Sequence, residues 1–299
     1  MGVEIRETLR GRDFLDISDL EPDQLRGLLD LARRIKSGEW LEQPLRGKQV
    51  AMLFQKPSMR TRISFEVGIV RLGGHPVIPA NSEIGLGERE SVPDVARVMS
   101  RYVHGIVARL HRHSELVEIA EYASIPVINA LTEHSHPCQI LADVLTIEEA
   151  TGRIDGRKVA FVGDGNNVAF SLMQAAGALG FQLSVVTPPA YRPAGDVDNQ
   201  GVRVTGDLGA VAGADVVYTD VWTSMGQEQE KQSRDRAFSE YQVNRELMDL
   251  APKAVFMHCL PAHRGEEVTA DVIDGPGSVV FDQAENRLYV QMALMASVL

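Results

Sequence analysis

The sequence Phe54-Gln55-Lys56-Pro57-Ser58-Met59-Arg60-Thr61-Arg62-Ile63-Ser64-Phe65 joins the end of a predicted strand to the start of a predicted helix. The apolar residues 50–54 are typical of a buried strand, and the spacing of Ile63, Val67 and Val70 predicts a helix. Two hydroxyl groups and two guanidinium groups lie at the junction. This junction of a strand and a helix predicts an α/β fold.

The helix start in this stretch carries groups that bind an anion. Free N–H groups and the positive end of a helix dipole favour negative charge. Arg60 and Arg62 add planar donors that match phosphate oxygens. A solvated, arginine-capped helix start is the structural alternative, but arginine there opposes the dipole. We therefore predict a phosphate-binding turn that lacks a glycine-rich loop.

Composition narrows the class of protein. A chain of 299 residues with 44% hydrophobic and 24% charged residues predicts a globular protein of about two domains. The first residues lack a signal-peptide pattern and no apolar run suits a membrane, so we expect a cytoplasmic protein. The sequence contains only two cysteines, Cys138 and Cys259, which argues against a disulfide framework. The net charge of −11 argues against nucleic-acid binding.

Strands and helices alternate along the whole chain. We predict strands at residues 50–54, 77–78, 105–110, 125–128, 158–162, 183–186, 202–204, 216–219, 255–258 and 279–281, with helices between most of them. This pattern predicts two α/β domains, each with a doubly wound central parallel sheet. The polar segment 152–157 is the best candidate for the boundary between them.

Polar residues follow several strands of the first half. Arg109 ends one strand, and His136 and Gln139 lie at the next helix start. Open parallel sheets bind ligands at the carboxyl ends of their strands, so these residues are candidate ligand contacts, with a surface ion pair as the alternative for Arg109. His134, His136 and Cys138 make only a weak zinc pattern, and we expect no metal.

Two turns at strand ends of the second half are rich in functional groups. Residues 220–228 lead into a charged segment, 229–240, that could act as a lid. Residues 258–264 contain Cys259 and His258, which could form a nucleophile pair. Neighbouring residues on a strand face opposite sides, however, so we do not expect these two side chains to meet.

Four motifs occur in order along the chain: Ser58-Met59-Arg60-Thr61-Arg62, His136-Pro137-Cys138-Gln139, Asp220-Val221-Trp222-Thr223-Ser224-Met225-Gly226 and His258-Cys259-Leu260-Pro261. Together they resemble the aspartate/ornithine carbamoyltransferase family over nearly the whole chain. The resemblance implies a carbamoyl phosphate-binding domain at residues 1–151, with a C-terminal helix at 284–299 that crosses back to it. Residues 152–283 would form the ornithine-binding domain.

The S-M-G and H-C-L-P motifs resemble family members that use ornithine. They imply transfer of the carbamoyl group of carbamoyl phosphate to the δ-amine of L-ornithine, which gives L-citrulline and phosphate in arginine biosynthesis. The resemblance further implies a homotrimer, or an assembly of trimers, with active sites at subunit interfaces. No cofactor, nucleic acid or membrane is expected.

The resemblance also implies a role for each motif residue. Carbamoyl phosphate would contact Ser58, Met59, Arg60, Thr61, Arg109, His136, Gln139, Cys259, Leu260 and Arg287. Ornithine would contact Asn167, Asp220, Ser224 and Met225. The catalytic groups would be Cys259, Arg109, His136 and Arg60.

Carbamoyl transfer to an amine requires hydrogen-bond donors for an oxyanion and a group that removes a proton. Attack on the carbamoyl carbon creates an oxyanion, which positioned donors such as His136, Arg109 and the Thr61 hydroxyl can stabilise. The attacking amine, with a pKa of ~10.4, is almost wholly protonated at neutral pH, a cost of roughly 4 to 5 kcal/mol. Asp220 and Cys259 are the candidates for removing that proton, with the leaving phosphate as a possible acceptor.

Two positions depart from the family pattern. Met59 stands where a threonine is usual, so one hydroxyl is lost and a bulkier thioether enters the pocket. Loop 81–90 lacks the glutamine often found there, so we assign it no ligand contact. Because of Met59, transfer to a related amine (N-acylornithine, putrescine or aspartate) remains an alternative.

Two further alternatives concern function of another kind. A non-catalytic paralogue that only binds carbamoyl phosphate would keep the fold, because fold does not imply function. A dinucleotide-binding dehydrogenase is suggested by Gly163 and Gly165 after a strand. Val168 takes the place of its third glycine, and Asp196 is too far along the chain to bind the ribose, so we reject it.

Overall fold

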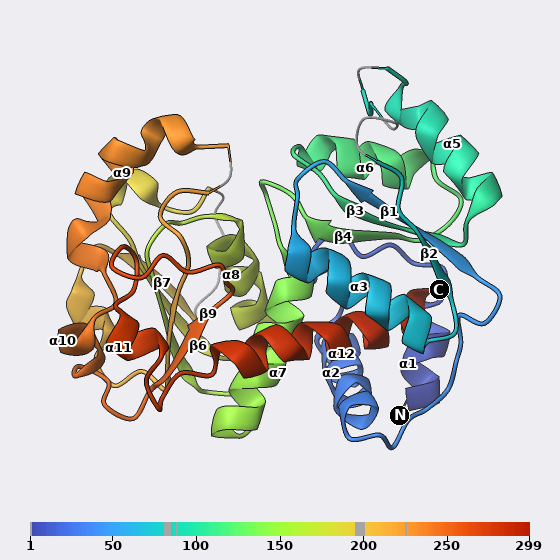
Figure 1. Ribbon diagram of the computed structural model, residues 1–299. Coiled ribbons are helices and arrows are strands. Elements are labelled where there is room, and N and C mark those ends of the chain that lie inside the picture. Colours follow the sequence, from blue (N-terminus) through green and yellow to red (C-terminus); the bar gives the residue numbers. More distant parts are fainter. Residues whose placement is uncertain (1, 81–84, 88, 195–200, 225) are drawn as a thin grey trace. The chain divides into compact units, whose positions relative to one another are not determined.

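Figure 1 shows the computed structural model, which describes residues 2–80, 85–87, 89–194, 201–224 and 226–299. The chain divides into two compact units. Unit 1 comprises Met1–Ala142 and Asn286–Leu299, and unit 2 comprises Asp143–Glu285. Each unit is an α/β fold built on one parallel sheet, which confirms the predicted fold class.

The sheet of unit 1 has four parallel strands in the order β2-β1-β3-β4. They are β1 (Gln49–Phe54), β2 (His75–Val77), β3 (Gly105–Arg109) and β4 (Val127–Leu131). The helices are α1 (Gly2–Leu9), α2 (Pro22–Lys36), α3 (Met59–Arg71), α5 (Val92–Tyr102) and α6 (His113–Tyr122). In Figure 1, α5 and α6 cover one face of the sheet and α3 lies on the other.

The sheet of unit 2 has five parallel strands in the order β7-β6-β5-β8-β9. They are β5 (Lys158–Val162), β6 (Gln182–Val186), β7 (Val202–Thr205), β8 (Val216–Thr219) and β9 (Val255–His258). The helices are α8 (Asn167–Leu179), α9 (Lys231–Phe238), α10 (Arg245–Met248) and α11 (Ala270–Ile273). Two longer helices, α7 (Pro137–Thr151) and α12 (Val280–Val298), each contain residues of both units.

The strand order explains where polar residues gather. In each sheet the chain leaves a central strand first to one side and later to the other, so the order reverses between β1 and β3 and between β5 and β8. Ligands of open parallel sheets bind outside the carboxyl ends of the strands at such a point. The predicted site residues after β1, β5 and β8, and Arg109 at the end of β3, lie at these carboxyl ends. His136 and Gln139 follow β4, Cys259 and Leu260 follow β9, and Arg287 lies on α12.

One predicted strand is absent. Residues 279–281 form no strand, because α12 begins at Val280, and an isolated bridge joins Ser278 to Phe256. The helix predicted from Ile63, Val67 and Val70 is α3, although these three side chains are exposed, whereas Phe65 is buried.

The polar segment 152–157 follows α7, and the two units divide earlier, between Ala142 and Asp143 within that helix. Among the residues described, no helix has both the length and the apolar character that crossing a membrane requires.

Candidate functional site

The turn after β1 forms a polar cluster at the start of α3. Ser58 caps this helix, and its Oγ accepts a hydrogen bond from the N–H of Thr61 at 3.4 Å. The same hydroxyl donates to Thr61 Oγ1 at 3.0 Å. Arg60 has a buried Nε with no hydrogen-bond partner among the described residues. We expected the thioether of Met59 to enter the pocket. Its side chain is 69% exposed, so it does not fill a pocket within unit 1.

Two buried arginines converge on Thr61, which is itself inaccessible to solvent. Nη2 of Arg287 donates to Thr61 Oγ1 at 2.6 Å, and Nη1 of Arg109 donates to the same oxygen at 3.5 Å. The sheet register pairs Arg109 with Phe54, the last residue of β1, which brings it beside the turn. The two guanidiniums concentrate positive charge beside the turn, and planar guanidinium donors match the oxygens of an anion.

His136 completes the cluster as a neutral group. It precedes α7 and is buried, and burial, followed by the charges of Arg287 and Arg109, holds the pKa of His136 well below its usual value. A neutral imidazole can donate a hydrogen bond without adding charge. Gln139, in the first turn of α7, is also buried.

The weak zinc pattern does not form a metal site. Cys138 Sγ donates to the carbonyl of Asn129 at 3.3 Å, and burial raises the pKa of Cys138 to about 12. The ring of His134 lies 4.8 Å from that of His113. Within the described parts of the chain, these residues do not gather as a set of metal ligands with His136.

A second cluster, in unit 2, is built around the carboxylate of Asp220. Sγ of Cys259 donates to Asp220 Oδ1 at 3.0 Å, and Nδ2 of Asn166 donates to Oδ2 at 2.7 Å. Asn166 is a residue that our sequence reasoning missed, although a helix N-terminus after a glycine-rich turn is a common place for asparagine. Asn167 begins α8, Ser224 is half-buried, and Met225 lies outside the described residues.

The ring nitrogens of His258 have partners other than the thiol of Cys259. Its Nε2 lies 3.0 Å from Oε1 of Glu267, and its Nδ1 accepts a hydrogen bond from the N–H of Leu260 at 2.8 Å. Asp220, His258 and Cys259 have ligand atoms close enough for a metal, but both His258 nitrogens are already engaged. A metal there would have to displace these bonds.

The start of α8 does not suit a dinucleotide. The side chain of Asn166 accepts hydrogen bonds from the N–H groups of Val168 and Ala169, which a pyrophosphate would need. A side chain at Gly165 would meet the backbone of Tyr191 and Pro193, so this glycine serves packing within unit 2. The structure therefore supports rejecting the dehydrogenase.

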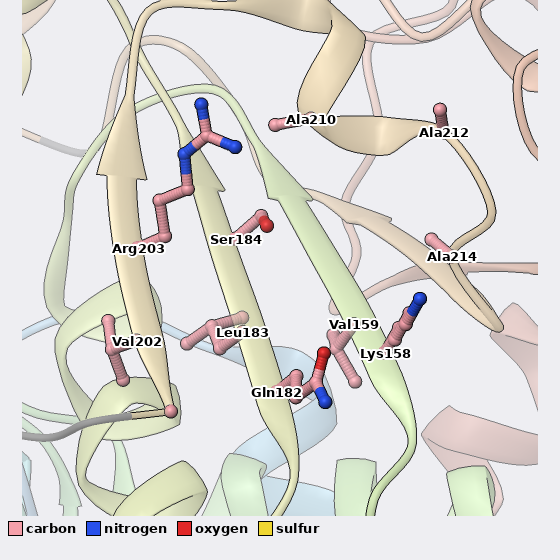
Figure 2. Close-up of a pocket in the computed structure, with 11 residues that line it drawn as sticks. Lys158, Val159, Gln182, Leu183, Ser184, Val202, Arg203, Ala210, Ala212 and Ala214 are labelled. Carbon is pink, nitrogen blue, oxygen red and sulfur yellow. The ribbon is translucent and has the colours of Figure 1, made fainter.

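A cavity of ≈ 400 Å³ in unit 2 is lined by residues other than those of the Asp220 cluster. Figure 2 shows its lining, which includes Lys158, Gln182 and Val202, the first residues of β5, β6 and β7. It thus opens near the amino ends of the strands and contains none of the predicted site residues.

The fold and the two clusters define a two-unit α/β protein with buried arginines around a hydroxyl in one unit and a carboxylate–thiol pair in the other. Residues 12–149 match the family model "Aspartate/ornithine carbamoyltransferase, carbamoyl-P binding domain". Residues 155–298 match "Aspartate/ornithine carbamoyltransferase, Asp/Orn binding domain". The chain belongs to the aspartate/ornithine carbamoyltransferase family.

Individual relatives agree with the family models. The ornithine carbamoyltransferase of Symbiobacterium thermophilum is 50% identical over 98% of this chain and 99% of its own. The crystal structure of the Thermus thermophilus ornithine carbamoyltransferase matches with a TM-score of 0.88 and 46% identity over 95% of this chain and 98% of that chain. The Pyrococcus furiosus enzyme matches with a TM-score of 0.92 and 48% identity over 97% of each chain.

Proposed function

We propose that this chain transfers the carbamoyl group of carbamoyl phosphate to the δ-amine of L-ornithine and releases L-citrulline and phosphate. The observation that carries the proposal is the convergence of buried Arg109 and Arg287 on Thr61 in unit 1. Relatives of nearly equal length, about half identical in sequence, are ornithine carbamoyltransferases.

The cluster of unit 1 supplies the groups that carbamoyl phosphate requires. Ser58, Met59, Arg60 and Thr61 bind the phosphate, partly through the N–H groups at the start of α3, where the helix dipole favours negative charge. Arg109, His136, Gln139 and Arg287 hold the carbamoyl group, joined by Cys259 and Leu260 from the H-C-L-P turn. Neutral His136 stabilises the oxyanion as a donor, and the guanidiniums stabilise the charge of the departing phosphate.

The cluster of unit 2 prepares the nucleophile. Asn167, Asp220, Ser224 and Met225 hold ornithine, and Asp220 attracts a cationic amino group. Asp220 already accepts a hydrogen bond from Cys259 Sγ, so the thiol and carboxylate form a short path along which a proton can move. Delivery of the neutral amine offsets the roughly 4 to 5 kcal/mol that deprotonation costs at neutral pH.

The same cluster favours ornithine over the alternative acceptors. A buried carboxylate repels the second carboxylate of aspartate and attracts the free α-ammonium of ornithine, which N-acylornithine lacks. Putrescine has no carboxylate for the loop that contains Ser224. A catalytic function uses both clusters, whereas a paralogue that only binds carbamoyl phosphate would not need both.

We further propose a homotrimer, supported by an exposed apolar face of α3. Four large apolar side chains on this helix are exposed, namely Met59 at 69%, Ile63 at 52%, Val67 at 36% and Val70 at 57%. An apolar stripe of this kind is typical of a contact between protein chains. Light scattering should report three chain masses for the wild type and a smaller mass for Ile63→Asp; a monomeric wild type would contradict the proposal.

The remaining assignments follow from the same function. We propose that residues 1–151 with 284–299 bind carbamoyl phosphate and that residues 152–283 bind ornithine, within arginine biosynthesis. We place the protein in the cytoplasm, because both cysteines are free and free thiols are typical of reducing compartments.

The test is carbamoyl phosphate-dependent product formation with ornithine, N-acetylornithine, putrescine or aspartate, with phosphate release followed in parallel. We expect citrulline from ornithine and no product from the other three amines. Turnover with another amine alone would retain the phosphate site and overturn the acceptor. Binding of carbamoyl phosphate without any turnover would favour the non-catalytic paralogue.

A further inference from the structure

A buried arginine on α9 lies outside all the motifs described so far. Arg234 is 6% exposed, although α9 lies in the charged segment that we predicted could act as a lid. Its Nη1 donates to Asp164 Oδ2 at 2.9 Å and to the carbonyl of Trp222 at 3.0 Å. One nitrogen atom therefore joins two separate turns of unit 2.

These two turns are the ones that carry the proposed ornithine contacts. Asp164 belongs to the turn between β5 and α8, which continues to Asn166 and Asn167. Trp222 lies in the loop after β8, between Asp220 and Ser224. Asn166 makes a second link, because its Nδ2 donates to Asp220 Oδ2 at 2.7 Å.

The surroundings of Arg234 fix its side chain in place. The guanidinium lies over the ring of Tyr191, 5.0 Å from the ring centre, and Nε donates to Glu230 at 3.0 Å. Phe238, one turn further along α9, is fully buried and stacks on the ring of Trp222 at 6.0 Å. Arg234 is thus contacted on several sides, so its side chain has little freedom to move and the distance between the two turns is fixed.

We propose that Arg234 is a positioning residue for ornithine, which fixes the turn of Asp164 relative to the loop of Trp222. The inference rests on the proposed function, because it concerns the same acceptor site. Arg234 also compensates the charge of Asp164, a second buried carboxylate whose charge interacts with that of Asp220.

The electrostatics of Asp164 agree with this geometry. Burial raises the pKa of Asp164 to about 6, Arg234 opposes that rise, and Asp220 and Glu230 add to it. Loss of Arg234 would therefore raise the pKa of Asp164 further and remove the ion pair that joins the two turns.

The experiment compares Arg234→Met with Arg236→Met, an exposed arginine on the same helix. We expect Arg234→Met to raise the KM for ornithine by about 10- to 100-fold, the loss typical of a hydrogen bond to a charged group. The KM for carbamoyl phosphate should change by less than about twofold, because that substrate contacts other residues. Arg236→Met should leave both constants near those of the wild type.

Two more variants separate positioning from charge compensation. The double variant Arg234→Met with Asp164→Asn removes both charges, but it does not restore the link between the two turns. Its KM for ornithine should therefore stay raised. Recovery to the wild-type value would overturn the proposal. Arg234→Lys keeps a charge but cannot reach Asp164, Trp222 and Glu230 together, so it should give an intermediate KM. If Arg234→Met fails to fold, a wild-type KM in Arg234→Lys overturns the proposal.

The pH profile gives an independent readout. The KM for ornithine of the wild type should rise as the pH falls through about 6, because Asp164 then takes up a proton. Asp164→Asn should remove this component. Lack of citrulline formation by the wild type would defeat the proposed function itself, whereas normal turnover with an unchanged KM in Arg234→Met would defeat only this inference.

Discussion

The two polar clusters of this chain have opposite charge and are built differently. In unit 1, Arg109 and Arg287 surround a single hydroxyl, and no carboxylate contacts that oxygen among the described residues. In unit 2, the carboxylate of Asp220 is surrounded by a thiol and an amide. The contrast shows how a chain with a net charge of −11 can present a local cationic site, because Arg109 and Arg287 are concentrated at one turn.

Position on the sheet explains why both clusters form in equivalent places. Each follows a strand next to the point where the order of the strands reverses. The fold thus offers the same kind of crevice twice, and the side chains decide which charge it accepts. Variants that remove one charge at a time therefore test whether the two clusters divide the work as proposed.

Cys259→Ala should produce the largest loss. If the thiol helps to move the proton of the amine, kcat should fall by about 10²- to 10⁴-fold, and the pH profile of kcat should shift. Cys138→Ala is the matched control, because Cys138 is buried against a carbonyl and its pKa is raised to about 12. A profile of kcat that Cys259→Ala leaves unchanged would exclude Cys259 from the mechanism.

Arg287→Met should reduce kcat/KM for carbamoyl phosphate by about 10²- to 10³-fold, the range seen when one donor to an oxyanion is removed. The KM for ornithine should change little, because Arg287 belongs to unit 1. Arg71→Met, an exposed arginine of α3, is the control for charge. An equal loss in the two variants would mean that general charge, and not the Thr61 cluster, attracts the substrate.

Arg60→Met should weaken carbamoyl phosphate binding by about 10- to 150-fold, which corresponds to ~1.5 to 3 kcal/mol for a hydrogen bond to a charged group. The opening motif offers a matched pair, because Arg62 is exposed and lies 3.7 Å from Glu66 on the next turn of α3. Arg62→Met should therefore change the affinity for carbamoyl phosphate little. Calorimetric titration with carbamoyl phosphate distinguishes the two, and similar losses would show that both arginines bind the phosphate.

The sequence was informative wherever a residue's role depends on its place along a strand. Arg109 could be located because it ends a buried strand, and the separate hydrogen-bond partners of His258 and Cys259 agree with the expectation that they do not pair. Such features are local, and the period of the pattern determines them.

The features that sequence reasoning missed depend on contacts between distant segments. Arg234 looked like one charge in a solvated segment, and only the folded unit shows that it meets Asp164, 70 residues earlier in the chain. Ile63 belongs to the apolar pattern that predicted α3, yet it is 52% exposed, whereas Phe65 and Ile69 of the same helix are buried. Residues 279–281 have the composition of a strand. They do not form one, because α12 begins at Val280, and Ser278 pairs with Phe256 through a single isolated bridge.

Met59→Thr should have the smallest effect and tests whether acceptor choice depends on the phosphate-binding turn. The side chain of Met59 is 69% exposed, so restoring the usual threonine should change the KM for ornithine by less than about twofold, as for other surface substitutions. Ile63→Thr, on the same exposed face, controls for the loss of apolar surface and of any contact between chains. The measurement is the ratio of turnover with ornithine to turnover with N-acetylornithine. If only Met59→Thr changes that ratio, the thioether takes part in selecting the acceptor, and the division of work between the two clusters is less complete than we propose.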